Sequence, residues 1–382
     1  MVYALPVDRD VDGRISALCD VYAAQGVLTD PAWRAALGEV PRHWFVPARA
    51  RVVRGGGPGH AIDRDRDPAA WWDAVYSDAV TPSCGSPRAV LHALHALAPR
   101  DHDRVLEAGT GAGWTAALLS WRVGGANVTS VEADELVAAR AAADLAEAGH
   151  GPHLFVGDEA AGFPDNAPYD RVHVTRGVTA IARAWLEQTR PGGVIVCPWT
   201  PAYGGGHLAC LTVDGQGRAI GRFPHLSGDT MERARPASPS LAQYVGGTEH
   251  ETERGTTLLD PRSVAWDSYG ADLAIGALVP RARKHVCAAR GDSGELTLWL
   301  LETGAPGGSW ASVDYEPGAD RFAVEQYGGR RLWDEVSRAY LRWVAWGRPG
   351  RERFGLTARP DGHDLWLDTP GNVLGGDVPG GG

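Results

Sequence analysis

The feature that most constrains the fold is a short apolar run that passes through three glycines into an Ala- and Leu-rich segment, at residues 105–119. The apolar run predicts a strand, and the segment after the glycines predicts a helix. Gly109, Gly111 and Gly113 stand at alternate positions in the turn, where the missing Cβ atoms let a ligand approach the main chain. Backbone N–H groups and the partial positive charge of a helix N-terminus face such a ligand. This stretch therefore predicts a binding site for a nucleotide-type cofactor.

Strands and helices alternate around this turn. We expect strands at 104–108, 127–132, 153–156, 171–174 and 193–198, and helices at 113–122, 134–149 and 179–189. This alternation predicts βαβ units and a mostly parallel sheet, so the fold class is α/β, a doubly wound Rossmann-like sheet. Ligands of such sheets bind at the carboxyl ends of the strands.

The flanking segments have different patterns. Residues 11–48 show helical periodicity, and a Ser/Gly/Pro-rich loop opens a helix that runs to residue 97. After Gly204, short alternating runs at 207–213, 273–279, 285–290, 296–302, 310–315 and 321–327 predict strands, and 332–346 predicts one amphipathic helix. We therefore expect an N-terminal helical segment with a substrate loop (1–98), the cofactor-binding core (99–204), and a C-terminal α+β extension with a Gly/Pro tail (205–382).

Composition excludes several classes of protein. A formal net charge of −10 argues against a general nucleic-acid binder. It would suit a basic peptide partner, but charge alone favours ordinary acidic solubility. There is no run of eighteen apolar residues to span a membrane, and the first residues lack the pattern of a secretory signal. The five cysteines are widely spaced without a Cys-x-x-Cys pair, so we expect reduced thiols, no metal site and a cytoplasmic location.

The glycine turn by itself fits two cofactors. One register of its glycines is typical of S-adenosylmethionine (SAM) methyltransferases, and another satisfies the dinucleotide fingerprint. Glu132 ends the next strand and could hold ribose hydroxyls in either case. Glu107 favours SAM, because a carboxylate there can meet an amino-acid ammonium group but would repel a pyrophosphate. Gly157 and Asp158 follow the third strand, where an acceptor could meet an adenine amino group, and they also favour SAM.

With these motifs, the chain resembles the protein-L-isoaspartate (D-aspartate) O-methyltransferases over about residues 40–198. The resemblance rests on the segments 40–47, 76–78, the Ser-Pro loop, 105–113, 157–158, 168–170 and 191–193. It implies methyl transfer from SAM to a peptide carboxylate. The implied cofactor-binding residues are Cys84, Gly85, Glu107, Gly109, Thr110, Gly111, Gly113, Glu132, Ala133, Gly157, Asp158 and Glu159.

The resemblance also implies residues around the reacting carboxylate. The family carries a Ser or Thr two residues before the loop proline, where this chain has Gly85. Either Ser86 or Ser83 takes over the hydroxyl role, or the hydroxyl is dispensable; Ser86 could equally be a helix N-cap. Tyr76 and Asp78 belong to an element that borders the carboxylate in the family. Arg176 replaces part of an Ala-rich segment and could pair with a substrate carboxylate or be a surface charge.

The C-terminal extension separates two functional hypotheses. Long forms of the family resemble enzymes that methylate an ordinary Asp of a ribosomally made peptide, so that the ester collapses to a succinimide (aspartimide). This role is our first hypothesis, and repair of isoaspartyl residues in damaged proteins is the second. A peptide-binding module without turnover is a third, because Gly85 displaces the hydroxyl.

Overall fold

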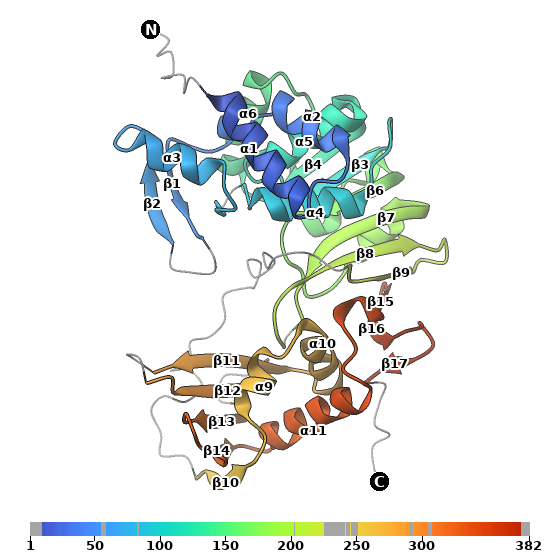
Figure 1. Cartoon of the computed structure of the whole chain (residues 1–382). Helices are drawn as coiled ribbons and strands as arrows, with labels where there is room; N and C mark the ends of the chain where they lie inside the picture. Colours follow the sequence, from blue (N-terminus) through green and yellow to red (C-terminus); the bar gives the residue numbers. More distant parts are fainter. Residues whose placement is uncertain are drawn as a thin grey trace.

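The computed structural model describes residues 10–54, 59–81, 84–201, 203–224, 241, 245, 251–289, 293–304 and 308–375. Its main element is a ten-stranded sheet with the strand order β17-β16-β15-β9-β8-β7-β6-β3-β4-β5 (Figure 1). The strands of its parallel half are β3 (Val105–Ala108), β4 (Val128–Glu132), β5 (His153–Val156), β6 (Tyr169–Val174) and β7 (Thr189–Trp199). All five expected core strands are thus present, and the predicted α/β fold class is confirmed.

Helices connect and cover the parallel strands. They are α5 (Trp114–Val123), α6 (Glu135–Glu147), α7 (Arg183–Gln188) and the 3-10 turn η3 (Glu159–Ala161). The helices α1 (Val11–Ala24), α2 (Pro31–Glu39), α3 (Pro68–Val75) and α4 (Pro87–Leu97) precede the sheet. Side chains alternate across each strand, so Val105 packs on the N-terminal helices while Leu106 faces α7 and the C-terminal part of the chain.

A small hairpin lies between the N-terminal helices. Its strands are β1 (Arg49–Val52) and β2 (His60–Asp63), which pair antiparallel. Ile62 is the buried residue of β2 and packs in the hydrophobic core of the N-terminal helices.

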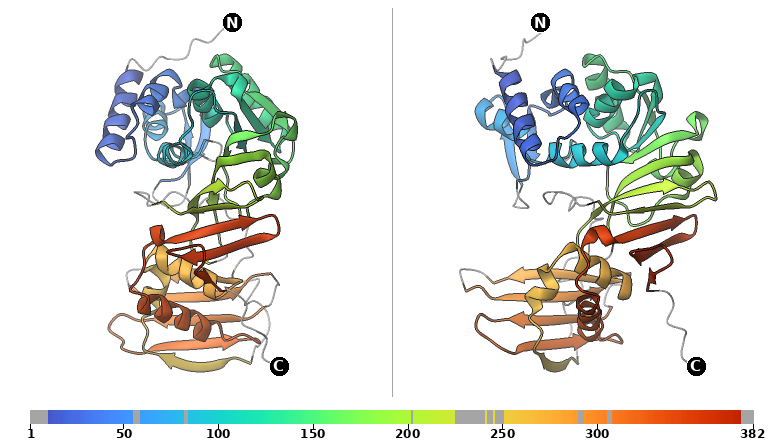
Figure 2. Two further views of the ribbon diagram at one scale, coloured as in Figure 1. Left: turned by 90° about the vertical axis from the view of Figure 1, so that its right-hand side faces the viewer. Right: turned by 45° about the vertical axis from the view of Figure 1, so that its right-hand side comes forward.

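The sheet continues without interruption past Gly204. β8 (His207–Val213) pairs antiparallel with β7, followed by β9 (Ala219–Arg222), β15 (Phe354–Arg359), β16 (Gly362–Leu367) and β17 (Val373–Leu374). Figure 2 shows β15 and β16 between the N-terminal body and the C-terminal sheet. The expected division at residue 204 therefore falls inside one sheet.

The rest of the C-terminal part is a separate five-stranded antiparallel sheet with the order β10-β14-β13-β12-β11. Its strands are β10 (Glu253–Thr257), β11 (Ala282–Ala288), β12 (Leu296–Glu302), β13 (Trp310–Tyr315) and β14 (Phe322–Tyr327), packed with α9 (Pro261–Trp266), α10 (Tyr269–Leu278) and α11 (Leu332–Ala345). The strand expected at 273–279 is wrong. This segment belongs to α10, whose Ser268 side chain accepts a hydrogen bond from the N–H of Ala271 and so caps the helix.

One hydrophobic core joins the two sheets. It includes Val172 and Ile195 of the parallel half, Leu356 of β15, and Val313 and Trp343 of the C-terminal layer. Among the described residues, no helix is long and apolar enough to cross a membrane, and no group of three or more His, Cys, Asp or Glu side chains could hold a metal ion.

Candidate active site

The glycine turn closes the first parallel strand as a tight loop. Gly109 and Gly111 have φ values of 99° and 55°, and Gly113, at φ 88°, is the N-cap of α5. A Cβ atom on Gly109 would lie 2.3 Å from the Oγ1 of Thr175. The N–H of Gly111 donates to the Oε2 of Glu132 at 2.9 Å, which fixes the turn against the end of β4. The backbone thus forms the cradle that the sequence predicts.

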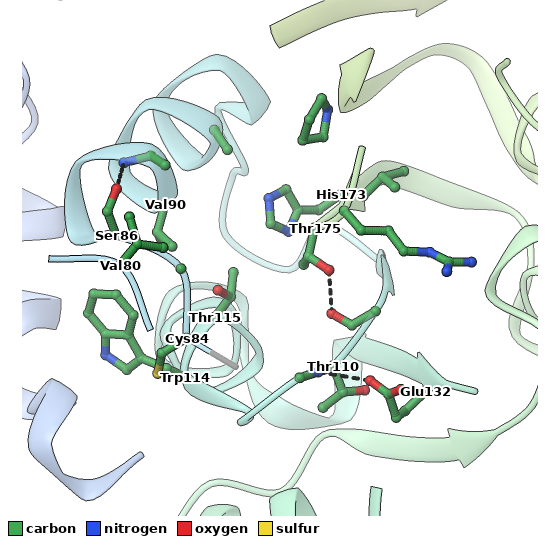
Figure 3. A pocket seen from close by; sticks show the side chains of 18 of the residues that line it. Val80, Cys84, Ser86, Val90, Thr110, Trp114, Thr115, Glu132, His173 and Thr175 are labelled. Atoms are coloured by element: carbon green, nitrogen blue, oxygen red, sulfur yellow. Dashed lines mark hydrogen bonds between the residues drawn. The ribbon is translucent and has the colours of Figure 1, made fainter. Parts of the chain in front are cut away.

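A cavity of about 870 Å³ opens over this turn (Figure 3). Its lining comes from the carboxyl ends of β4, β6 and β7, from the loop before α4, and from β1. Of the predicted site residues, it is lined by Cys84, Gly85, Ser86, Gly109, Thr110, Gly111, Glu132, Glu159 and Arg176. The N-terminal loop and the strand ends therefore meet at one site.

Glu132 fits the role of a cofactor ligand. Its carboxylate accepts hydrogen bonds from the backbone N–H groups of Gly111 and Asp134, at 2.9 and 3.1 Å. A carboxylate has about four lone-pair sites, so two acceptor positions remain for ribose hydroxyls. The same side chain can therefore set the turn and hold a nucleoside sugar.

Glu107 lies behind the cavity and is not part of its lining. Its side chain is completely buried and accepts a hydrogen bond from the Oγ of Ser130 at 2.6 Å. The Nδ1 of His173 is 3.9 Å from its Oε1, and neither of these two atoms has a hydrogen-bond partner. Burial raises the pKa of Glu107 to about 8 and lowers the pKa of His173 to about 4. Direct contact of Glu107 with an ammonium group stays a prediction.

The raised pKa of Glu107 has a consequence for stability. The pKa of a Glu carboxyl in an unfolded chain is about 4.3. Between that pH and about 8, Glu107 therefore keeps a proton in the folded chain that it has lost in the unfolded chain. The stability that protonated Glu107 contributes is fully present below the pKa of the unfolded carboxyl, and it is lost as the pH rises toward 8. Glu107→Gln removes this dependence, so its unfolding temperature relative to the wild type should rise between pH 5 and pH 8. Thermal unfolding of both proteins across that range measures it, and parallel curves would contradict it.

Ser86 is buried and starts α4. Its Oγ accepts a hydrogen bond from the N–H of Ala89 at 3.1 Å, so the N-cap alternative is confirmed. The hydroxyl proton is still available to a ligand, because capping uses only a lone pair. Ser83, the other candidate for the hydroxyl, lies outside the described residues. Cys84 lines the cavity but its Sγ is turned toward the carbonyl of Phe45, at 3.7 Å.

Tyr76 and Asp78 do not line the cavity. The Tyr76 hydroxyl is 2.6 Å from the Nδ1 of His43, and Asp78 pairs with the Nε of Arg88 at 2.7 Å and with the Tyr22 hydroxyl. These contacts hold α1, α3 and α4 together. Both residues therefore support the helices around the loop, and their contact with a substrate carboxylate stays a prediction.

Arg176 is at the cavity but is already paired. Its guanidinium forms an ion pair with Glu159, and more than half of its side chain is exposed. Burial raises the pKa of Glu159, while the charge of Arg176 lowers it. The guanidinium of Arg176 therefore already has an anionic partner in Glu159, and its pairing with a substrate carboxylate stays a prediction.

Four further predicted cofactor residues lie outside the lining. Gly113 is behind the turn, where a Cβ would come within 3.1 Å of Leu145. Ala133 and Asp158 are exposed, and the Asp158 carboxylate accepts a hydrogen bond from the N–H of Ala160 at 2.9 Å. Gly157 donates its N–H to the carbonyl of Glu132 at 2.9 Å. Their contacts with a cofactor stay predictions.

Sequence reasoning missed several lining residues. Thr175 donates a hydrogen bond from Oγ1 to the carbonyl of Gly109 at 2.7 Å, and His173 precedes it on β6. Both end a predicted strand at the ligand-binding edge of the sheet, and this position was the available signal. Arg51 had no such signal, because its strand was not expected.

Fold and site together are those of the nucleotide-cofactor α/β class, because the glycine turn, the Glu132 acceptor and the loop before α4 line one cavity. A family model described as protein-L-isoaspartate(D-aspartate) O-methyltransferase matches residues 60–210. The protein-L-isoaspartate O-methyltransferase of Opitutus terrae is 34% identical over 186 residues, covering 48% of this chain and 72% of the relative. The enzyme of the same name from Roseiflexus castenholzii is 31% identical over 248 residues, covering 62% and 96%.

A solved structure of a protein-L-isoaspartate O-methyltransferase is also similar, with 19% identity, a TM-score of 0.49, and coverage of 93% of this chain and 100% of that one. The chain belongs to the protein-L-isoaspartate (D-aspartate) O-methyltransferase family. This confirms the predicted enzyme class, a SAM-dependent carboxyl O-methyltransferase, and SAM as its cofactor.

Proposed function

We propose that this protein methylates the free carboxylate of isoaspartyl residues in peptides or proteins. The observation that carries the proposal is the similarity to relatives named for this substrate, over the residues that build the cavity. It reverses the order of our two sequence hypotheses. The shape of the site also supports the proposal. The glycine turn and the loop before α4 line one cavity, where the cofactor and the substrate carboxylate could meet.

The chemistry asks little of the protein beyond positioning. SAM, when bound, supplies a methyl group on a positively charged sulfur. A substrate carboxylate oxygen forms the new C–O bond as the S–CH₃ bond breaks, and the bonding pair stays on the sulfur. Holding two reactants in line can contribute about 7–11 kcal/mol. The turn at Gly109 and Gly111 would hold the cofactor, and the loop at Ser86 would orient the carboxylate by donating its hydroxyl proton.

The Ser86 role can be separated from its N-cap role. Ser86→Ala removes cap and donor, and we expect about 1 kcal/mol less stability and at least about tenfold lower kcat/KM. Ser86→Asp keeps a capping acceptor but places a negative charge at a buried position beside the substrate, so activity should fall further than in Ser86→Ala. Thermal unfolding and a methyl-transfer assay measure both variants. Full activity of Ser86→Asp would assign Ser86 to capping alone.

A second candidate is methylation of an ordinary Asp in a ribosomally made peptide. The observation that favours it is a second cavity, of about 650 Å³, in the C-terminal extension. It is lined by Gly204–Gly206, by the α9–α10 junction and by β11, and it includes the exposed Trp266 and the ion pair of Lys284 with Asp272 at 2.5 Å. Such a surface supports recognition of a longer peptide beyond its reacting residue.

Trp266→Ala tests this second contact. For a longer peptide substrate we expect KM to rise about tenfold, because an exposed indole is a typical binding anchor. A hexapeptide that fills only the first cavity should keep its KM. Steady-state kinetics with both lengths measure the difference, and Leu341→Ala, at another exposed apolar residue, is the control. If Trp266→Ala changed the KM of the longer peptide no more than that of the hexapeptide, the second cavity would no longer support the second candidate.

Competition between two substrates distinguishes the candidates. A peptide with one isoaspartyl residue and its counterpart with Asp are mixed with SAM and enzyme, and each methyl ester is followed by mass spectrometry. The proposal predicts a kcat/KM ratio above about 100 in favour of the isoaspartyl peptide. A ratio in favour of the Asp peptide would support the second candidate.

A further inference from the structure

The charged groups of the methyl-transfer cavity can be accounted for one by one. Its described lining contains two carboxylates, Glu132 and Glu159, and two guanidinium groups, Arg51 and Arg176. Both Glu132 oxygens accept backbone N–H groups, and Glu159 is paired with Arg176. The guanidinium of Arg51 makes no hydrogen bond or ion pair with the described residues. It is therefore the uncommitted cation of this lining.

The position of Arg51 is set by the hairpin. It lies on β1, opposite Ala61 of β2, and its side chain is exposed. Two residues later, Val53 and Val80 exchange backbone hydrogen bonds of 3.0 and 2.9 Å, which tie β1 to the segment that leads into Gly85 and Ser86. The backbone that carries Arg51 is thus tied to the substrate-loop side of the cavity.

Arg51 lies outside the part of the chain that the family model matches, which begins at residue 60. It is not one of the motif residues by which the family is recognised. The evidence for a binding role of Arg51 is therefore its location. It lines the cavity that, under the proposed function, receives a substrate carboxylate.

We infer that Arg51 binds the reacting carboxylate of the substrate peptide and makes this enzyme select an anionic residue. The inference rests on the proposed function, since it names a contact of that same site. A guanidinium group matches a carboxylate with paired N–H donors and keeps it ionised. Each carboxylate oxygen keeps a lone pair that these hydrogen bonds do not use, so one of the oxygens can still attack the methyl group.

The experiment compares Arg51→Gln and Arg51→Lys with a matched control, Arg49→Gln. Arg49 is on the same strand, but it pairs with Asp63 at 3.1 Å and does not line the cavity. We expect the KM of the methylated peptide, isoaspartyl or Asp, to rise on the order of 10- to 100-fold in Arg51→Gln. The rise should be smaller in Arg51→Lys and absent in Arg49→Gln. SAM affinity, measured by calorimetry, should be unchanged in all three.

A second readout uses peptides that do not react. Binding of the substrate peptide and of the same peptide with its reacting carboxylate replaced by a primary amide is measured by fluorescence polarisation, with the cofactor product S-adenosylhomocysteine present. The wild type should prefer the carboxylate peptide, and Arg51→Gln should lose that preference. If the wild type methylates a peptide and Arg51→Gln keeps its KM and its preference, the role of Arg51 is wrong while the proposed function stands. If the wild type methylates neither peptide, the proposed function fails first.

Discussion

Gly109→Ala is expected to reduce SAM affinity on the order of 100-fold, because small displacements of a binding cradle have effects of this size. The added Cβ would lie 2.3 Å from the Oγ1 of Thr175, which itself donates to the carbonyl of Gly109. The turn would have to move away from Thr175 and so away from its position beside Glu132. The backbone conformation at φ 99° is also unfavourable for any residue with a Cβ. Isothermal calorimetry with SAM measures the loss.

Gly149→Ala is the matched control for this substitution. Gly149 has φ 75°, and an added Cβ would meet no atom within 4 Å. It should lose about 1 kcal/mol of stability from backbone strain alone and keep its SAM affinity. If Gly109→Ala bound SAM as tightly as Gly149→Ala, the turn would not be the cofactor site.

A chain that ends at Gly204 is expected not to fold. It would lose β8, which pairs with β7 from Val194 to Trp199, and leave the edge of β7 open. It would also lose buried side chains of the shared core, among them Leu211, Phe223, Val313 and Leu356. Burial of four such side chains contributes about 6–12 kcal/mol, which is close to the whole stability of a typical domain.

Expression and circular dichroism of this truncated chain test the prediction, with a chain ending at Gly375 as the control. The control keeps every element from α1 to β17 and should unfold cooperatively like the full chain. A soluble 1–204 chain that binds SAM would contradict the shared core and would restore the domain boundary expected from the sequence.

The parallel half of the fold is predictable because its signals are local. The apolar strands, their turns and the three glycines each carry a pattern that the structure retains. The boundary at Gly204 is not predictable in this way, because a glycine-rich stretch resembles a linker whether or not the next strand joins the same sheet. The segment 273–279 shows a related limit. Its apolar residues are buried in α10, and a short apolar run does not distinguish a buried helix from a strand.

Site residues at the ends of predicted strands could be located from the sequence. Residues whose roles depend on side-chain partners could not. Gly109, Gly111 and Glu132 lie at the cavity as expected. Sequence reasoning placed Asp78 and Arg176 near the substrate, but it did not show that they form ion pairs with Arg88 and Glu159, because these pairs depend on how separate elements pack. Arg51 enters the cavity only because β1 pairs with β2 and is tied to Val80, which no local pattern indicates.

The most direct test of the account is a methyl-transfer reaction with SAM carrying a labelled methyl group and a peptide with a single isoaspartyl residue. We expect the label to enter the peptide as a base-labile ester, which then gives a succinimide lighter than the starting peptide by one water. Gly109→Ala should give little of either product. Absence of label from both the isoaspartyl peptide and its Asp counterpart, with SAM shown to be bound, would contradict the account.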